Sequence, residues 1–326
     1  MIEFLVIRSK IFIAVIMKVA IFSLFLFTAL HFSLYAQTFS NPGSTRAVII
    51  GVADYPKDKD DCEFANRDAI IFHSMLMSGT LFGKPDQKNI TLLVDSQATY
   101  TSIMTSLYNM IELTKENDRI IIYFSGHGIR NEIMNPVRSN ILPYDYRQEK
   151  NIFGNAISEN DMKDIVYTIK AKHAKCILII DACHVGGFSN IVRDGDENMI
   201  CLLACRSEEV SSNDKRWGNG MSVFTYYLME ALIGNAETDE LATQDWIAIN
   251  EVEKYVQDSI SRDVISFRLD PQHPMIHGDL NMSLAPVVES TFIKYKKDKK
   301  DHPSKNDPRD FFDGLPEEQE KVEGRN

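Results

Sequence analysis

Basic residues are in the minority in this sequence: 35 Lys and Arg stand against 46 Asp and Glu, for a formal net charge of −11 at pH 7. A nucleic-acid-binding domain carries a basic face, so this balance argues against a nucleic-acid partner and suits cationic substrates or partners better. No internal repeat is visible. With 44% hydrophobic and 25% charged residues among 326, the chain has the composition of a folded protein with a core.

Cysteine is also scarce, with five residues and no C-x-x-C pair. This leaves little support for a thioredoxin-type redox site or a zinc ribbon. Cys176, Cys201 and Cys205 lie in or beside apolar runs, where a small buried hydrophobe is the default role. The acidic residues between 236 and 245 lack the D-x-[DN]-x-[DN]-G spacing of a calcium-binding EF-hand, which excludes that motif.

The first 36 residues have the layout of a secretory signal peptide. Met17, a candidate for the true start, opens a short basic region, an apolar stretch follows from Val19 to Leu34, and cleavage is expected after Ala36. This pattern predicts export to the periplasm or the medium. The alternative is an uncleaved membrane anchor, because residues 11–34 are apolar enough to span a bilayer apart from one lysine.

Beyond a short linker at residues 37–45, apolar β-prone runs alternate with helical patterns through residues 46–287. We expect strands at 46–52, 90–94, 120–124, 176–180 and 199–204, and helices from about 63 to 76, 103–111, 157–169, 221–232 and 250–260. Such alternation predicts an α/β fold with a mostly parallel central sheet flanked by helices on both faces. Residues 188–198 read as an exposed loop. Residues 288–326, rich in Lys, Asp, Glu and Pro, read as a charged, disordered tail.

Two short segments follow buried strands of the expected sheet. Ser125-Gly126-His127-Gly128 comes after the run 120–124, and Asp181-Ala182-Cys183-His184 comes after the run 176–180. Open parallel sheets place their chemistry at the carboxyl ends of strands. We therefore expect the His127 imidazole and the Cys183 thiol to meet there.

A thiol beside an imidazole is a nucleophile–base pair, because the imidazole takes the thiol proton and can return it to a leaving amine. Glycines on both sides of His127 permit unusual backbone angles and close substrate approach. The amides of Gly128 and Cys183 are candidates for an oxyanion hole. Taken singly, such a Cys or His is usually a core or surface residue, but the two together indicate a cysteine peptidase.

The segments Tyr123–Gly128 (YFSGHG) and Asp181–Gly187 (DACHVGG) resemble those of the caspase-like cysteine peptidases, most closely the metacaspases and their bacterial relatives. Supporting likeness comes from AVIIGV at 47–52, NRDA at 66–69, LPYD at 142–145 and FTYYL at 224–228. The resemblance implies a caspase-like fold and a Cys–His dyad without a third catalytic residue. In that dyad Cys183 forms a thioester acyl-enzyme and His127 is the general base and acid.

The same resemblance implies a specificity. Caspases that cut after Asp carry Gln-Ala-Cys-Arg-Gly, whereas this chain has Asp181 two residues before Cys183. In metacaspases the residues matching Asp68, Ser125 and Asp181 line an acidic S1 pocket, so we expect protein or peptide substrates cleaved after Arg or Lys. The simpler roles are a helix N-cap for Asp181 and a first-turn helix residue for Asp68.

No metal or other cofactor is expected. Some metacaspases need calcium, held by acidic residues after the two catalytic segments. Here residues 129–142 contain only Glu132, and Asn190 stands where an acid would be expected, so calcium dependence has little support. A metal site at His184 beside Cys183 is rejected, because adjacent side chains diverge after a strand.

Two rival functions stay open: a catalytically silent scaffold or interaction module on the same fold, and a cysteine transpeptidase that shares the acyl-enzyme. Basic residues in polar loops, at Arg193 and near Lys215-Arg216, are candidate sites of self-cleavage. Trp217, with the loop 211–220, is either part of a substrate pocket or a surface turn.

Overall fold

The structure is a computed structural model that describes residues 43–56, 60–79, 81, 84–147, 154–193, 195–236, 246–279 and 282–286. All of these residues belong to one compact unit that begins at Gly43. The expected signal peptide and the expected tail at 288–326 lie outside the described residues. No helix within the described ranges has both the length and the apolar character needed to cross a membrane.

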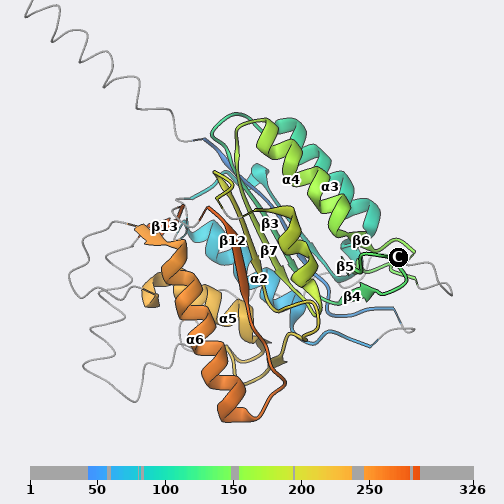
Figure 1. Cartoon of the computed structure of the whole chain (residues 1–326). Coiled ribbons are helices and arrows are strands. Elements are labelled where there is room, and N and C mark those ends of the chain that lie inside the picture. Colours follow the sequence, from blue (N-terminus) through green and yellow to red (C-terminus); the bar gives the residue numbers. More distant parts are fainter. Residues whose placement is uncertain are drawn as a thin grey trace, which may run out of the picture. The chain divides into compact units, whose positions relative to one another are not determined.

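A six-stranded sheet in the order β12-β8-β7-β3-β1-β2 forms the centre of this unit (Figure 1). Its strands are β1 (Thr45–Gly51), β2 (Ile90–Val94), β3 (Arg119–Ser125), β7 (Lys175–Asp181), β8 (Met199–Leu203) and β12 (Met275–Gly278). Every neighbouring pair is parallel except β12 and β8. The predicted mostly parallel sheet is confirmed, and the antiparallel edge strand β12 was not predicted.

Helices cover both faces of the sheet, as predicted. They are α2 (Ala65–Ser78), α3 (Tyr100–Leu113), α4 (Glu159–Ala171), α5 (Val223–Glu230) and α6 (Ile249–Phe267). In Figure 1, α3 and α4 lie on one side of the sheet, and α2, α5 and α6 lie on the other. Short helical turns complete the set: η1 (Gln87–Asn89), η2 (Asp95–Gln97), η3 (Val185–Ile191) and the π-helical η4 (Ala231–Asn235).

The central strands β1, β3, β7 and β8 carry nearly continuous apolar runs, because both of their faces are buried. Along β3, Ile121 and Tyr123 pack on the α2 side, whereas Ile122 and Phe124 pack on the α3 side. Thr99 is the N-cap of α3, because its side chain accepts a hydrogen bond from the Ser102 amide.

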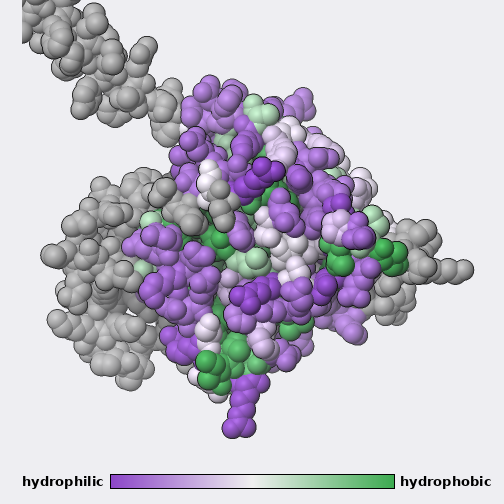
Figure 2. Space-filling model, in the orientation of Figure 1, coloured by the Kyte–Doolittle hydropathy of each residue, from purple (hydrophilic) through white to green (hydrophobic). Residues whose placement is uncertain are grey.

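Three small sheets were not predicted. They are β4 (Gly128–Asn131) with β5 (Arg138–Ile141) and β6 (Ile157–Ser158), β9 (Asn213–Asp214) with β10 (Met221–Ser222), and β11 (Trp246–Ala248) with β13 (Ser283–Pro286). The helix expected from 157 therefore begins two residues later, after β6. Figure 2 shows apolar surface in the region of β4 and β5, where the turn residues Ile133, Met134 and Val137 are exposed.

Two loop predictions were wrong in part. The expected exposed loop at 188–198 overlaps η3, in which Phe188 and Ile191 are buried against the sheet. Trp217 is only 3% exposed, and its indole N–H donates to Asp263, so it is a core residue rather than a surface turn. The expected burial of Cys176, Cys201 and Cys205 is confirmed.

Candidate active site

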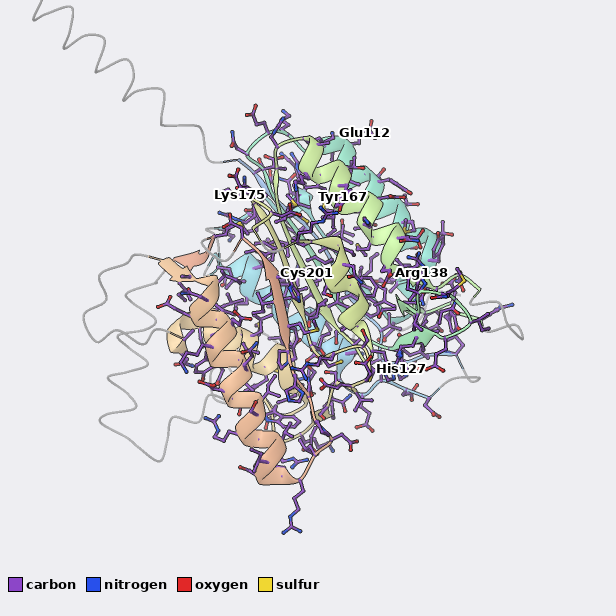
Figure 3. The ribbon with its side chains drawn as sticks, in the orientation of Figure 1. Glu112, His127, Arg138, Tyr167, Lys175 and Cys201 are labelled. Carbon is purple, nitrogen blue, oxygen red and sulfur yellow. The ribbon has the colours of Figure 1, made fainter. Side chains whose placement is uncertain are left out.

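The two candidate catalytic segments leave neighbouring parallel strands at the same edge of the sheet. Ser125, the last residue of β3, pairs in register with Asp181, the last residue of β7. His127 and Cys183 each follow two residues later. Figure 3 places His127 at the end of the strands away from Lys175, where β7 begins. Both segments thus start from the carboxyl ends of the strands, as parallel α/β sheets require of a ligand site.

The backbones of these two segments touch at Gly128. A Cβ on this glycine would lie 2.0 Å from the carbonyl oxygen of Cys183, far inside van der Waals contact. Only glycine fits at such a close approach. The structure therefore brings Gly128 and Cys183, the two expected oxyanion-hole residues, side by side. That their amides point at a substrate oxygen stays a prediction.

Cys183 is half-buried, and its side chain contacts the main chain at Ser211. The Ser211 amide donates to Cys183 Sγ at 3.4 Å. The next residue, His184, has a left-handed φ of 60°, so the chain turns sharply away after the thiol. Two hydrogen bonds hold the main chain of His184 in this turn. The His184 amide donates to the Glu209 carbonyl at 2.9 Å, and Ser139 Oγ donates to the His184 carbonyl at 2.6 Å.

His127 is held from its ring and from its backbone. Its Nε2 lies 2.7 Å from the carbonyl oxygen of Asp60. A carbonyl can only accept, so Nε2 carries the proton and, in the neutral ring, Nδ1 is the acceptor nitrogen. The His127 amide donates to the Tyr55 hydroxyl at 3.0 Å, and that hydroxyl donates to the Leu142 carbonyl at 2.9 Å. The Tyr55 ring centroid is 4.8 Å from the imidazole centroid.

Sequence reasoning missed Asp60 and Tyr55. Asp60 acts through a main-chain carbonyl, which any residue provides, so no side-chain pattern marks it. Tyr55 lies in a loop just after β1, and only the packing of that loop on the His127 turn gives its hydroxyl two partners. Its burial is nearly complete, and this desolvation raises the pKa of Tyr55 well above the ordinary value, so the phenol stays protonated as a donor.

The three residues expected to form the S1 pocket come together. Asp68, Ser125 and Asp181 line one pocket with Cys183, and Cys62, Ser211 and Ser222 line it too. Ser125 Oγ donates to Asp68 Oδ2 at 3.0 Å. Ser222 bridges the two acids, because its amide donates to both oxygens of Asp68, at 3.2 and 3.4 Å, and its hydroxyl donates to Asp181 Oδ2. Ser222 was not predicted as a site residue.

Both carboxyl groups of the pocket are buried. Desolvation, followed by the nearby charge of Asp181, raises the pKa of Asp68 well above its usual range. Desolvation also raises the pKa of Asp181, and hydrogen bonds from Ser222, Thr225 and Ser211 partly offset that rise. Two ionised carboxylates this close repel each other. A cation between them would relieve that repulsion, so the pocket is suited to a guanidinium or ammonium group.

Of the two simpler roles considered above, a helix N-cap for Asp181 is wrong, and a first-turn helix position for Asp68 is correct but incomplete. Asp181 ends β7 and is not an N-cap, although its Oδ2 also accepts the Thr225 amide, at 3.2 Å, in the first turn of α5. The N-cap of that helix is Ser222. Asp68 does lie in the first turn of α2, but it is 1% exposed and turned toward the pocket.

No metal centre emerges from the described residues. Within those ranges, no three or more His, Cys, Asp or Glu side chains are arranged to hold an ion. Glu132, the acid considered for calcium, belongs to no such group. His184 Nδ1 lies 3.1 Å from the Ser207 carbonyl, so this ring is engaged in holding the loop.

Comparison with known protein families matches residues 44–283 to the caspase domain. The chain belongs to the caspase domain family. The fold and the family predicted from the sequence are thereby confirmed. Among curated proteins, this caspase domain is 24% identical to metacaspase-7 of Arabidopsis thaliana over 224 residues, covering 65% of this chain and 52% of that protein.

Metacaspase-4 of the same plant is 26% identical over 184 residues, covering 53% of this chain and 41% of that protein. The chain thus spans about half, or less, of these curated relatives. Among solved structures, protein GSU0716 from Geobacter sulfurreducens superposes with a TM-score of 0.50 at 14% identity, covering 73% of this chain and 97% of that one. That likeness concerns the fold alone.

Proposed function

We propose that this caspase-domain protein is a cysteine endopeptidase in which Cys183 is the nucleophile and His127 the general base and acid. One observation carries the proposal. The loops bearing the two residues leave adjacent parallel strands and touch at Gly128, while Asp60 and Tyr55 fix the imidazole that follows β3. The family match and the metacaspase relatives support the same reaction class.

In this mechanism His127 takes the proton of the Cys183 thiol, and the sulfur attacks the carbonyl carbon of the scissile bond. The carbonyl electron pair moves to oxygen, and the amides of Gly128 and Cys183 are the proposed donors to that oxyanion. When the C–N bond breaks, the leaving amine takes the proton from the imidazolium. A thioester remains, which a water molecule deprotonated by His127 hydrolyses to release the acid and the thiol.

Cleavage after Arg or Lys is the specificity we propose. It is supported by two buried carboxyl groups, Asp68 and Asp181, in the pocket that also contains the Cys183 side chain. A basic P1 side chain entering this pocket would form charge-assisted hydrogen bonds with them. Peptide or protein substrates with a basic residue at the cleavage site are therefore the expected partners, and no cofactor is part of the proposed chemistry.

Two alternatives share the fold. A silent scaffold needs neither a competent thiol nor an acidic pocket, and the presence of both in one place favours the enzyme. A transpeptidase would form the same thioester with Cys183 but pass the acyl group to an amine instead of water. Only the identity of the products separates it from a hydrolase.

Export is a further part of the proposal, based on the signal-peptide pattern of the first 36 residues. Contact with a membrane follows only if that segment is retained. Fractionation of cells that produce the full-length chain, with mass spectrometry of its N-terminus, tests this point. An N-terminus at Gln37 in the exported fraction supports cleavage, whereas an intact N-terminus in the membrane fraction supports the anchor.

The deciding experiment measures hydrolysis of fluorogenic peptides that end in Arg, Lys or Asp. The full-length protein is compared with its Cys183→Ala variant, with and without calcium. We expect turnover after Arg or Lys that disappears in the variant. Turnover only after Asp contradicts the acidic pocket, and absence of turnover from both proteins, with and without calcium, favours the scaffold.

A further inference from the structure

A buried glutamine behind the proposed active site joins the nucleophile to the acidic pocket. Gln272 lies between α6 and β12 and is 1% exposed. Its Oε1 accepts the Ser212 amide at 2.9 Å, and its Nε2 donates to the Ala204 carbonyl at 3.1 Å and to Ser211 Oγ at 3.2 Å. Both ends of the amide are therefore used, and they fix its orientation.

The segment that Gln272 holds touches both parts of the site. Ser211 Oγ donates to Asp181 Oδ1 at 2.8 Å, and the Ser211 amide donates to Cys183 Sγ at 3.4 Å. Because Gln272 donates to the same hydroxyl, that hydroxyl is left with its proton directed at Asp181. The bond to the neighbouring Ser212 amide sets the path of the main chain that carries the donor to Cys183.

The residue after Gln272 holds the other end of the same segment. The His273 amide donates to the Glu209 carboxylate at 2.8 Å, and His273 Nδ1 lies 2.5 Å from it. The Glu209 carbonyl in turn accepts the amide of His184, next to the nucleophile. Gln272 and His273 thus hold the segment 209–212 against the loop that carries Cys183.

We propose that Gln272 is a positioning residue that orients Asp181 through Ser211 and sets the amide donor on Cys183. The inference rests on the proposed peptidase function. It adds that one side chain from outside both loops aligns the acidic S1 pocket with the nucleophile. If Gln272 only fills space, its replacement should change the stability of the protein but leave kcat, KM and the alkylation rate of Cys183 unchanged.

Three variants of the full-length protein separate these possibilities. Gln272→Met keeps the size of the side chain and removes all three hydrogen bonds. Ser211→Ala removes the hydroxyl link to Asp181 but keeps the amide on Cys183, and the third variant combines the two. Gln257→Met is the matched control, because Gln257 donates to the Pro274 carbonyl close by, and its hydrogen bonds go to Glu253 and Pro274 rather than to the segment 209–212.

Two readouts are needed: kcat and KM on an Arg peptide, and the rate at which iodoacetamide alkylates Cys183 at pH 7. For Gln272→Met we expect kcat/KM to fall about 10- to 100-fold, the range for breaking buried hydrogen bonds. Its alkylation rate should change several-fold. Ser211→Ala should raise KM while leaving alkylation unchanged, and the double variant should fall short of the product of the two single effects. Gln257→Met should match the wild type.

A folded Gln272→Met with wild-type kcat, KM and alkylation rate overturns the proposal, and so do strictly multiplicative effects in the double variant. If Gln272→Met does not fold, Gln272→Glu replaces it, since it keeps the acceptor for Ser212 and loses the donor to Ser211. The same non-multiplicative result with Ser211→Ala is then expected. If the wild type cleaves no peptide, the proposed function fails, but the alkylation rates still decide whether Gln272 positions the nucleophile.

Discussion

Replacing Asp181 by asparagine separates charge from shape in the proposed S1 pocket. Asp181 Oδ2 accepts the hydroxyl of Ser222, the Thr225 hydroxyl at 2.6 Å and the Thr225 amide at 3.2 Å, whereas Oδ1 accepts the Ser211 hydroxyl at 2.8 Å. Asparagine can keep its oxygen toward the three donors and turn its NH₂ toward Ser211, whose hydroxyl then accepts. The pocket should therefore keep its shape and lose one negative charge.

The size of the effect follows from the burial of the carboxylate. Removing one partner of a buried ion pair costs about 3–5 kcal/mol. At about 1.4 kcal/mol for each tenfold change in rate, this predicts a fall in kcat/KM of about 10²- to 10⁴-fold on an Arg peptide. Asp68 remains in the pocket to bind the cation, so we expect the lower half of that range.

The assay compares two peptides that differ only at P1. One carries Arg and the other citrulline, which has nearly the same shape and no charge. The wild type should prefer Arg strongly, and Asp181→Asn should lose most of that preference while its rate on citrulline changes little. Equal losses on both peptides, or wild-type turnover of the Arg peptide, would refute the role of Asp181 in charge recognition.

Asp118→Asn is the matched control. Asp118 is also a buried acid, but it lies just before β3, at the opposite end of the sheet, where it accepts from Arg46 Nε at 3.0 Å. This change should lower the melting temperature and leave the ratio of Arg to citrulline cleavage as it is in the wild type. A change in that ratio would mean that the assay reports stability rather than recognition.

Three further predictions concern the same site. Tyr55→Phe leaves the His127 amide without its acceptor, so kcat/KM should fall about 10- to 100-fold in peptide assays; wild-type kinetics would contradict this role. Burial and the charge of Asp181 raise the pKa of Asp68, so its ionisation costs stability as pH rises above about 4. Asp68→Asn should therefore melt higher than the wild type at pH 7 while losing Arg cleavage, and a stability difference independent of pH would be evidence against it. Gly128→Ala places a Cβ 2.0 Å from the Cys183 carbonyl oxygen and should cost about 1–3 kcal/mol of stability, measured by denaturant unfolding, together with the activity; an active, stable variant would show that the two loops separate freely.

Much of the fold was predictable because buried parallel strands and amphipathic helices leave periodic patterns. The strands at 90–94 and 120–124 were found almost to the residue, because each is a continuous run of apolar and β-prone residues. The edge strand β12 was missed because its alternating burial over a few residues gives too short a pattern. The buried helix η3 was missed since glycines and polar residues surround its few apolar ones.

Some residues of the candidate site could likewise be predicted from the sequence, and others could not. His127 and Cys183 were found because each follows a readable strand, and neighbouring parallel strands bring their carboxyl ends together. Ser222 and Gln272 were not found, although they contact Asp181 and Ser211. Nothing in their local sequence marks them, and each reaches its partner from an element distant in the chain.

The sequence by itself determined which side chains are the candidates for the chemistry and at which end of the sheet they lie, because strand periodicity and strand-end turns are local properties. Only the tertiary structure decided how those side chains are held. The carbonyl of Asp60 on His127, the hydroxyl of Tyr55 beneath it and the amide of Ser211 on Cys183 all join segments far apart in the chain. Such contacts depend on how the elements pack against one another, and no local pattern encodes that packing.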